Sequence, residues 1–128
     1  MPPRLDFPEL MRLARLSAAV KKHCSCTPKS LAGWENMPMS LKEEQLREIA
    51  TLVFAEEEEL TLDEYHPNGT YFWSDDAPIA PKFYPYNRCG VWECVLCGRC
   101  FLRYTEAGAY YAENRIRILD PALIVDAR

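Results

Sequence analysis

The feature that most constrains this chain is a short cysteine motif, Cys94-Val95-Leu96-Cys97-Gly98. Two thiolates at this spacing can bind one tetrahedral metal ion from a single tight turn. Glycine after the second cysteine lets the backbone fold back beneath the metal, because it has no Cβ that would clash. The motif therefore predicts a turn that supplies two ligands of a metal site.

This motif resembles the knuckle of zinc ribbons, in which the turn joins two strands. The resemblance covers about residues 92–106, and the residues on both sides of the turn have the pattern expected of strands. It implies zinc as the bound ion, and it implies no particular activity.

A structural zinc site needs four ligands, so two must come from outside the knuckle. Zinc ribbons usually carry a second Cys-x-x-Cys pair, which this chain lacks, and the nearest substitute is the Cys-Ser-Cys segment at residues 24–26. His23 could replace one of that pair, and Cys89 or Cys100 could replace one of the knuckle pair. The predicted ligand set is Cys24, Cys26, Cys94 and Cys97.

The two remaining cysteines need no metal to explain them. Cys100 alternates in register with Leu102 and Tyr104, which is typical of a core thiol on a strand. A set of six buried thiols without metal is the alternative for the whole group. If the predicted set binds an ion, that ion joins the first helix to the C-terminal strands and has a structural role.

The length of 128 residues and a hydrophobic content of 48% allow a core that does not depend on metal. We predict one α+β domain over residues 1–128, with two N-terminal helices packed on a C-terminal antiparallel β-meander that carries the knuckle. Its expected parts are helical (1–55), acidic and proline-rich (56–90), and β-meander (91–128).

Two helices are expected in the N-terminal part, over residues 6–22 and 40–53. Apolar residues recur at helical spacing in both. Between them, Trp34 is expected to anchor an irregular segment to the core. Each helix begins with a side chain that can cap it, followed three positions later by a glutamate. These capping pairs are Asp6 with Glu9 and Ser40 with Glu43.

The last third of the chain has the alternation of a β-meander. In residues 99–106 and 110–119, side chains at alternate positions are of the same kind, as on the two faces of a strand. A third strand, which contains Val91 and Trp92, should lead into the knuckle. A short apolar segment at residues 123–125 is expected to add an edge strand.

The charge is uneven along the chain, whose formal net charge is −4. Residues 1–30 carry six Lys/Arg against two Asp/Glu, residues 31–80 carry two against twelve, and residues 81–128 carry seven against five. An acidic middle stretch argues against nucleic acid as its partner and favours a protein with a basic surface. The residues predicted to contact that partner are Glu56, Glu57, Glu58, Glu59, Asp63 and Glu64.

The leading hypothesis is a small non-enzymatic protein that acts by binding another protein, with zinc holding its shape. Immunity or inhibitor proteins that neutralise bacterial toxins or enzymes share this small, acidic, cytoplasmic character. No apolar run approaches the length of a membrane span, and the N-terminal residues lack the apolar core of a signal peptide. We therefore expect a cytoplasmic location without membrane partners, where reducing conditions disfavour disulfides.

Two other functions are compatible with the sequence. One is a nucleic-acid-binding or transcription-associated zinc-ribbon module, in which arginines interleave with aromatic residues. The other is a zinc-dependent hydrolase or deaminase with Glu64 or His66 as general base, although a polar loop is the favoured interpretation of these two residues. The arginines of the first alternative are Arg99, Arg103, Arg115 and Arg117.

Overall fold

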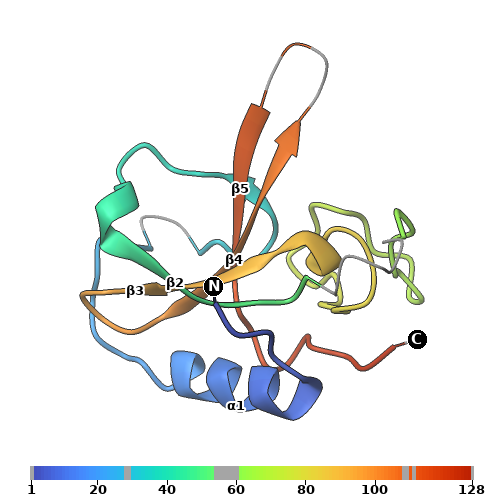
Figure 1. Ribbon diagram of the computed structural model, residues 1–128, viewed down its shortest axis with the longest axis horizontal. Helices are drawn as coiled ribbons and strands as arrows, with labels where there is room; N and C mark the ends of the chain where they lie inside the picture. The colour runs from blue at the N-terminus through green and yellow to red at the C-terminus, as the bar shows by residue number, and fades with distance from the viewer. Residues whose placement is uncertain (1, 28–29, 54–60, 108–109, 111, 128) are drawn as a thin grey trace.

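Within the residues that it describes, the computed structural model combines one α-helix with an antiparallel sheet (Figure 1). It describes residues 2–27, 30–53, 61–107, 110 and 112–127. The elements are α1 (Phe7–Ala18), β1 (Glu35–Asn36), the 3₁₀ turn η1 (Glu43–Gln45), β2 (Leu46–Thr51), the 3₁₀ turn η2 (Tyr86–Arg88), β3 (Gly90–Cys94), β4 (Cys100–Ala107) and β5 (Ala112–Ile118).

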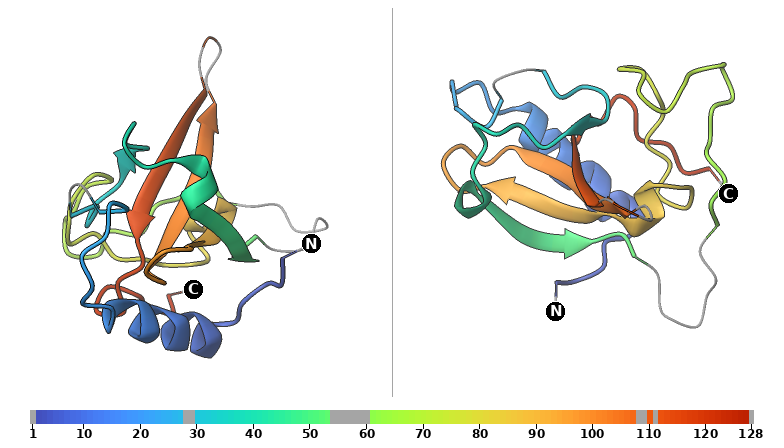
Figure 2. Two further views of the ribbon diagram at one scale, coloured as in Figure 1. Left: turned by 90° about the vertical axis from the view of Figure 1, so that its left-hand side faces the viewer. Right: turned by 90° about the horizontal axis from the view of Figure 1, so that it is seen from above.

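All five strands belong to one sheet, in the order β1-β5-β4-β3-β2. Helix α1 lies along one face of this sheet, while residues 61–85 form an irregular lobe at one end (Figure 2). The helix and the antiparallel sheet agree with the predicted α+β class. The arrangement with two N-terminal helices does not agree.

Helix α1 begins as the sequence predicts. The Asp6 carboxylate accepts a hydrogen bond from the Glu9 backbone N–H at 2.9 Å, and the Glu9 carboxylate accepts one from Asp6 at 3.0 Å. The helix ends at Ala18, four residues before the predicted end. Near that end, the Ser17 hydroxyl accepts a hydrogen bond from the Cys100 backbone N–H at 2.8 Å and attaches the helix to β4.

The second predicted helix, residues 40–53, is wrong. The chain there forms η1 and then β2, which pairs antiparallel with β3. The register of β2 shifts between Glu48 and Ala50, so Leu46 packs in one core cluster and Ala50 in the other. Such a bulge buries residues at a spacing of four on opposite faces of a strand. The same spacing imitates helical periodicity in the sequence.

The sheet carries a hydrophobic cluster on each face. The larger cluster contains Leu10 and Ala14 of α1 together with Leu102 of β4. The smaller one contains Phe101, Ile116 and the cysteines of the knuckle region. Trp34 is 1% exposed and contacts the rings of Phe72, Tyr86 and Tyr104, which confirms the prediction that it anchors its segment to the core.

Strands β3, β4 and β5 follow one another in the sheet and correspond to the predicted meander. The prediction that residues 123–125 add an edge strand to the meander is wrong. Ile124 forms an isolated parallel bridge with Ile79, so this segment attaches the irregular lobe and does not extend the meander. The division of the chain into three parts within one domain stays a prediction.

Candidate metal centre

Four cysteines from two distant segments meet beside the turn between β3 and β4. Their sulfur atoms all lie within 4.8 Å of one another. The Cys24 and Cys94 Sγ atoms are 3.6 Å apart, as are those of Cys26 and Cys97, and all four cysteines are free thiols. In a tetrahedral site with zinc–sulfur bonds of ~2.3 Å, neighbouring sulfurs are ~3.8 Å apart. The spacing therefore fits a tetrahedral thiolate site.

The knuckle pair is positioned by the backbone of its own turn. The Gly98 N–H donates to the Cys94 carbonyl at 2.9 Å, and the Cys94 N–H donates to the Arg99 carbonyl at 2.8 Å. Gly98 has φ of +89°, which favours glycine. A Cβ at this position would meet nothing within 4 Å. Glycine is required here by backbone conformation and not by a clash, which corrects the reason expected from the sequence.

Two side chains outside the four cysteines donate hydrogen bonds to the sulfurs. The Gln45 amide nitrogen lies 3.7 Å from the sulfurs of both Cys24 and Cys94 and 3.1 Å from the Ser25 hydroxyl. The Arg99 guanidinium donates to the Cys97 sulfur at 3.5 Å and to the Val20 carbonyl at 3.4 Å. Donors of this kind stabilise negative charge on thiolates and orient metal ligands.

The surroundings shift the pKa values of Cys94 and Cys26 in opposite directions. Burial raises the pKa of Cys94, but hydrogen bonds from the backbone N–H groups of Leu96 and Cys97 and from Gln45 outweigh it and lower that pKa to about 7. Burial, and then hydrogen bonds to Cys97 and Cys24, raise the pKa of Cys26 well above its ordinary value. Protons and a divalent cation therefore compete for these sulfurs, since metal ligation requires the thiolate form.

The alternative ligands lie outside this cluster. Cys89 is fully buried in the larger core cluster, donates to the Pro85 carbonyl at 3.4 Å, and has its pKa raised by burial. Cys100 also belongs to the larger core cluster. Burial, followed by the charges of Glu93 and Cys97, raises its pKa to about 12. His23 is exposed and is not part of the four-sulfur group.

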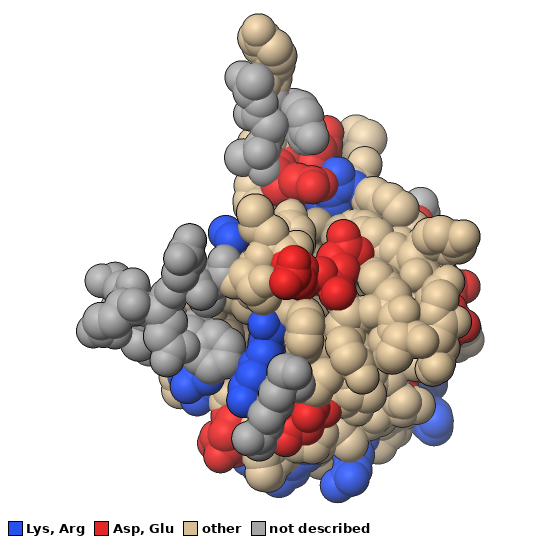
Figure 3. Space-filling view, turned by 90° about the vertical axis from the view of Figure 1, so that its right-hand side faces the viewer, with Lys and Arg blue, Asp and Glu red and all other residues tan. Residues whose placement is uncertain are grey.

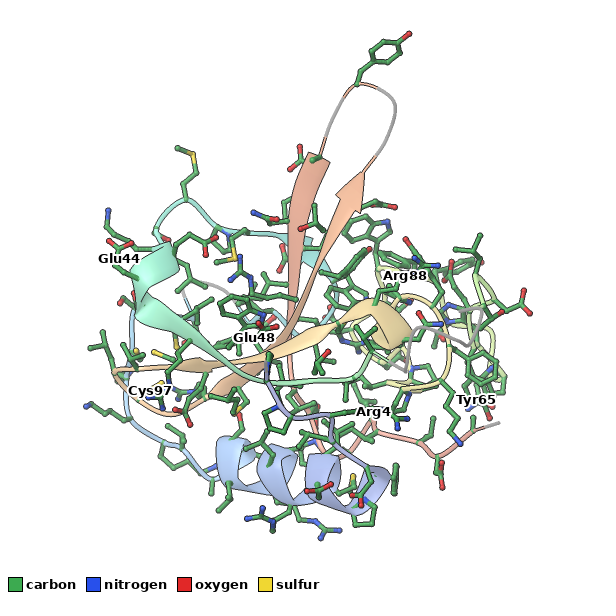
Figure 4. All side chains as sticks on the ribbon, in the orientation of Figure 1. Arg4, Glu44, Glu48, Tyr65, Arg88 and Cys97 are labelled. Atoms are coloured by element: carbon green, nitrogen blue, oxygen red, sulfur yellow. The ribbon has the colours of Figure 1, made fainter. Side chains whose placement is uncertain are left out.

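The acidic residues predicted to bind a partner are only partly described. Glu56, Glu57, Glu58 and Glu59 lie outside the described residues. Asp63 is exposed, and the Glu64 carboxylate lies 2.8 Å from His66 Nε2, while His66 Nδ1 lies 2.7 Å from the Thr70 hydroxyl. This chain of contacts belongs to a local loop. Cys97 and Tyr65 lie at opposite ends of the molecule in Figure 4, so Glu64 and His66 are not beside the four sulfurs.

The arginines of the nucleic-acid alternative are engaged within the protein. Arg117 is fully buried and donates to the carbonyls of Ala32, Asp75 and Ala77 and to the Tyr86 hydroxyl. Each of the other three arginines also has a partner within the protein. Arg103 binds the Glu43 carboxylate, Arg115 binds Glu106, and Arg99 contacts Cys97. All four guanidinium groups therefore have partners within the described part of the protein.

Comparison with protein-family models, with curated proteins and with solved structures finds no match for this chain. Within the described residues, no helix is both long enough and apolar enough to cross a membrane. The four-sulfur cluster could hold a metal ion, which is consistent with zinc. Sequence reasoning missed Gln45, because that residue lay inside a segment assigned to a helix and no local pattern connects it to the cysteines.

Proposed function

We propose that this is a small non-enzymatic zinc-binding protein that acts by binding another protein. The observation that carries the zinc assignment is the convergence of four cysteine sulfurs within 4.8 Å. Four soft thiolate ligands at tetrahedral spacing favour zinc. They fill its coordination sphere, whereas catalytic zinc keeps a position for water.

Zinc in this site would fasten three parts of the chain together. Cys24 and Cys26 follow α1, Cys94 ends β3, and Gln45 ends η1. From Cys26 to Cys94 the chain has 67 intervening residues. If the ion acts like a cross-link, closing a loop of this length in the unfolded state stabilises the fold by ~4 kcal/mol.

The acidic stretch supplies the proposed recognition face for a partner with a basic surface. Asp63 is exposed and Glu64 is partly exposed, and Glu56–Glu59 precede them in the chain. On the face in Figure 3, acidic side chains lie in several small groups, and Lys or Arg side chains lie beside the upper and lower groups. Complementary charge accelerates association and gives specificity. An immunity or inhibitor protein that neutralises a toxin or an enzyme is the type of function proposed.

Metal analysis tests the zinc part of the proposal. Purified protein should contain stoichiometric zinc, and X-ray absorption should show sulfur ligands only. A C94S/C97S double variant should lose the metal, while C89S, which removes a buried thiol outside the cluster, should keep it. A folded protein without stoichiometric metal, or with nitrogen or oxygen ligands, would contradict the assignment.

Charge reversal tests the partner-binding part. Replacing Glu57, Glu58 and Glu59 by lysine should abolish binding to the cognate partner, which a neighbouring gene can identify, and should leave zinc content unchanged. Equal affinity of the triple variant and the unaltered protein in a calorimetric titration would end the proposal of an acidic recognition face.

A further inference from the structure

A second candidate site lies on the sheet, away from the cysteines. It is a groove with a cavity volume of about 240 Å³, which we call the arginine groove. Five elements contribute to it, and Glu48 and Arg88 are labelled in Figure 4. The residues that carry the argument are Glu48 of β2, Arg88 of η2, Gly90 and Trp92 of β3, Arg103 of β4 and Asn114 of β5.

One residue that lines the groove is a buried arginine whose charge is already paired. Arg103 is 8% exposed, and its two terminal nitrogens donate to the Glu43 carboxylate at 3.2 and 2.8 Å. Its guanidinium carbon lies 4.4 Å from the centroid of the Trp92 ring. The buried Arg103 Nε has no hydrogen-bond partner among the described residues. Because this Nε is itself buried, a ligand in the groove cannot reach it, and Arg103 forms part of the wall.

Further donors surround this arginine. Arg88 is exposed and makes no ion pair with the part of the chain that the structure describes, although its guanidinium lies over the Tyr84 ring. The Asn114 side-chain oxygen accepts from Thr105 at 2.9 Å, which leaves the amide N–H groups of Asn114 as donors. Glu48 contributes the one carboxylate of the lining. The groove is therefore rich in donors and has a single negative group.

Gly90 keeps the floor of the groove open. A Cβ at this position would lie 2.3 Å from the Glu48 carboxylate oxygen Oε2 and 2.9 Å from Trp92 Nε1. Gly90 does not have the positive φ of Gly69 and Gly98, so its backbone conformation suits any residue. What glycine provides here is space between the carboxylate and the indole.

We propose that the arginine groove binds a small organic anion that also carries a hydrogen-bond donor. The carboxylate or phosphate of the ligand binds the Arg88 guanidinium and the Asn114 amide N–H groups, and its ammonium or hydroxyl group donates to Glu48. The volume fits a compound about as large as an amino acid and is smaller than the range of ~300–1,000 Å³ for drug-sized ligands. This proposal is independent of zinc and of a protein partner.

Isothermal calorimetry with L-serine, L-malate and glycerol 3-phosphate tests the groove. The first two probes carry a carboxylate with an ammonium or a hydroxyl donor, and the third carries a phosphate with hydroxyl donors. We expect saturable binding of at least one probe, with a Kd of ~1 mM or tighter. Acetate, which has no donor group, should bind more weakly. Binding of L-serine or L-malate alone would identify the anion as a carboxylate, and binding of glycerol 3-phosphate alone would identify it as a phosphate.

Variants assign the binding to the groove. R88A should weaken binding ~10-fold or more, since a hydrogen bond to a charged group contributes ~1.5–3 kcal/mol. G90A should also weaken binding, because the added Cβ would lie 2.3 Å from Glu48 Oε2 and displace that carboxylate. R12A is the matched control, because Arg12 is an exposed arginine of α1 and its loss changes the net charge equally. Circular dichroism should show all three variants folded. Failure of all three probes to bind, or equal affinity of R88A and R12A, would overturn the proposal.

Discussion

Arg117 shows how much the surroundings decide the role of a single residue. It alternates along β5 with Ile116 and Ile118, which indicates a polar face in the sequence. In the structure that face is covered by other segments, and the guanidinium donates to the carbonyls of Ala32 and Ala77, at 2.7 Å in both cases. A buried arginine must have such acceptors. The loops that supply them are distant in sequence, so alternation alone cannot reveal the burial.

Gly98 and Gly69 allow a prediction at the scale of one residue. Both have positive φ, and a Cβ would meet nothing within 4 Å of either. Replacing either by alanine should destabilise the fold by ~1–2 kcal/mol, because this backbone conformation disfavours an L side chain. Only G98A should also weaken zinc binding, because Gly98 donates to Cys94 in the knuckle.

Urea unfolding and competition with a chromophoric chelator measure these two effects separately. G69A serves as the control with equal backbone cost outside the metal site. Equal zinc affinity of G98A and G69A would show that the conformation of Gly98 does not position the knuckle sulfurs.

At the scale of elements, the sequence predicted what local patterns determine. The capping box of α1, the alternation of β4 and the turn at Cys94–Cys97 each depend on residues close together in the chain. The helix predicted over residues 40–53 is wrong because the bulge in β2 imitates a helical spacing. Only the pairing of β2 with β3 distinguishes a strand from a helix here. The same strand pairing brings Gln45 to the cysteines, which explains why that contact was also missed.

Gln45 gives the prediction that belongs to η1. Its amide lies 3.7 Å from the sulfurs of Cys24 and Cys94, so it holds the start of β2 against the site. Q45A should lower zinc affinity ~10–100-fold, which is the usual cost of removing a group that orients metal ligands. Competition with a chelator measures the affinity. E44A removes the exposed neighbouring side chain and should have no effect (Figure 4).

If Q45A and E44A lost zinc affinity equally, Gln45 would not be the residue that orients the ligands. Such a result would indicate a general loosening of η1. Retained stability of Q45A in urea, together with weaker zinc binding, would separate orientation of the ligands from support of the fold.

At the scale of the whole molecule, the four-sulfur site and the larger core cluster lie in different regions. The four sulfurs adjoin the smaller cluster, around Phe101 and Ile116, whereas α1 packs in the larger cluster on the other face of the sheet. The larger cluster contains none of the predicted ligands. The fold near the metal should therefore depend on zinc more strongly than the packing of α1 against the sheet.

Removal of zinc should accordingly loosen one side of the molecule and leave the other folded. Treatment with a chelator should increase hydrogen exchange at residues 23–27, at η1 and at the turn after β3, while amides of α1 and β4 keep most of their protection. Local opening of this kind costs less free energy than global unfolding. The C94S/C97S variant is the control, because a chelator should not change its exchange further. A loss of protection across α1 and β4 as large as that around the four sulfurs would contradict the division, since it would mean that the metal supports both regions equally.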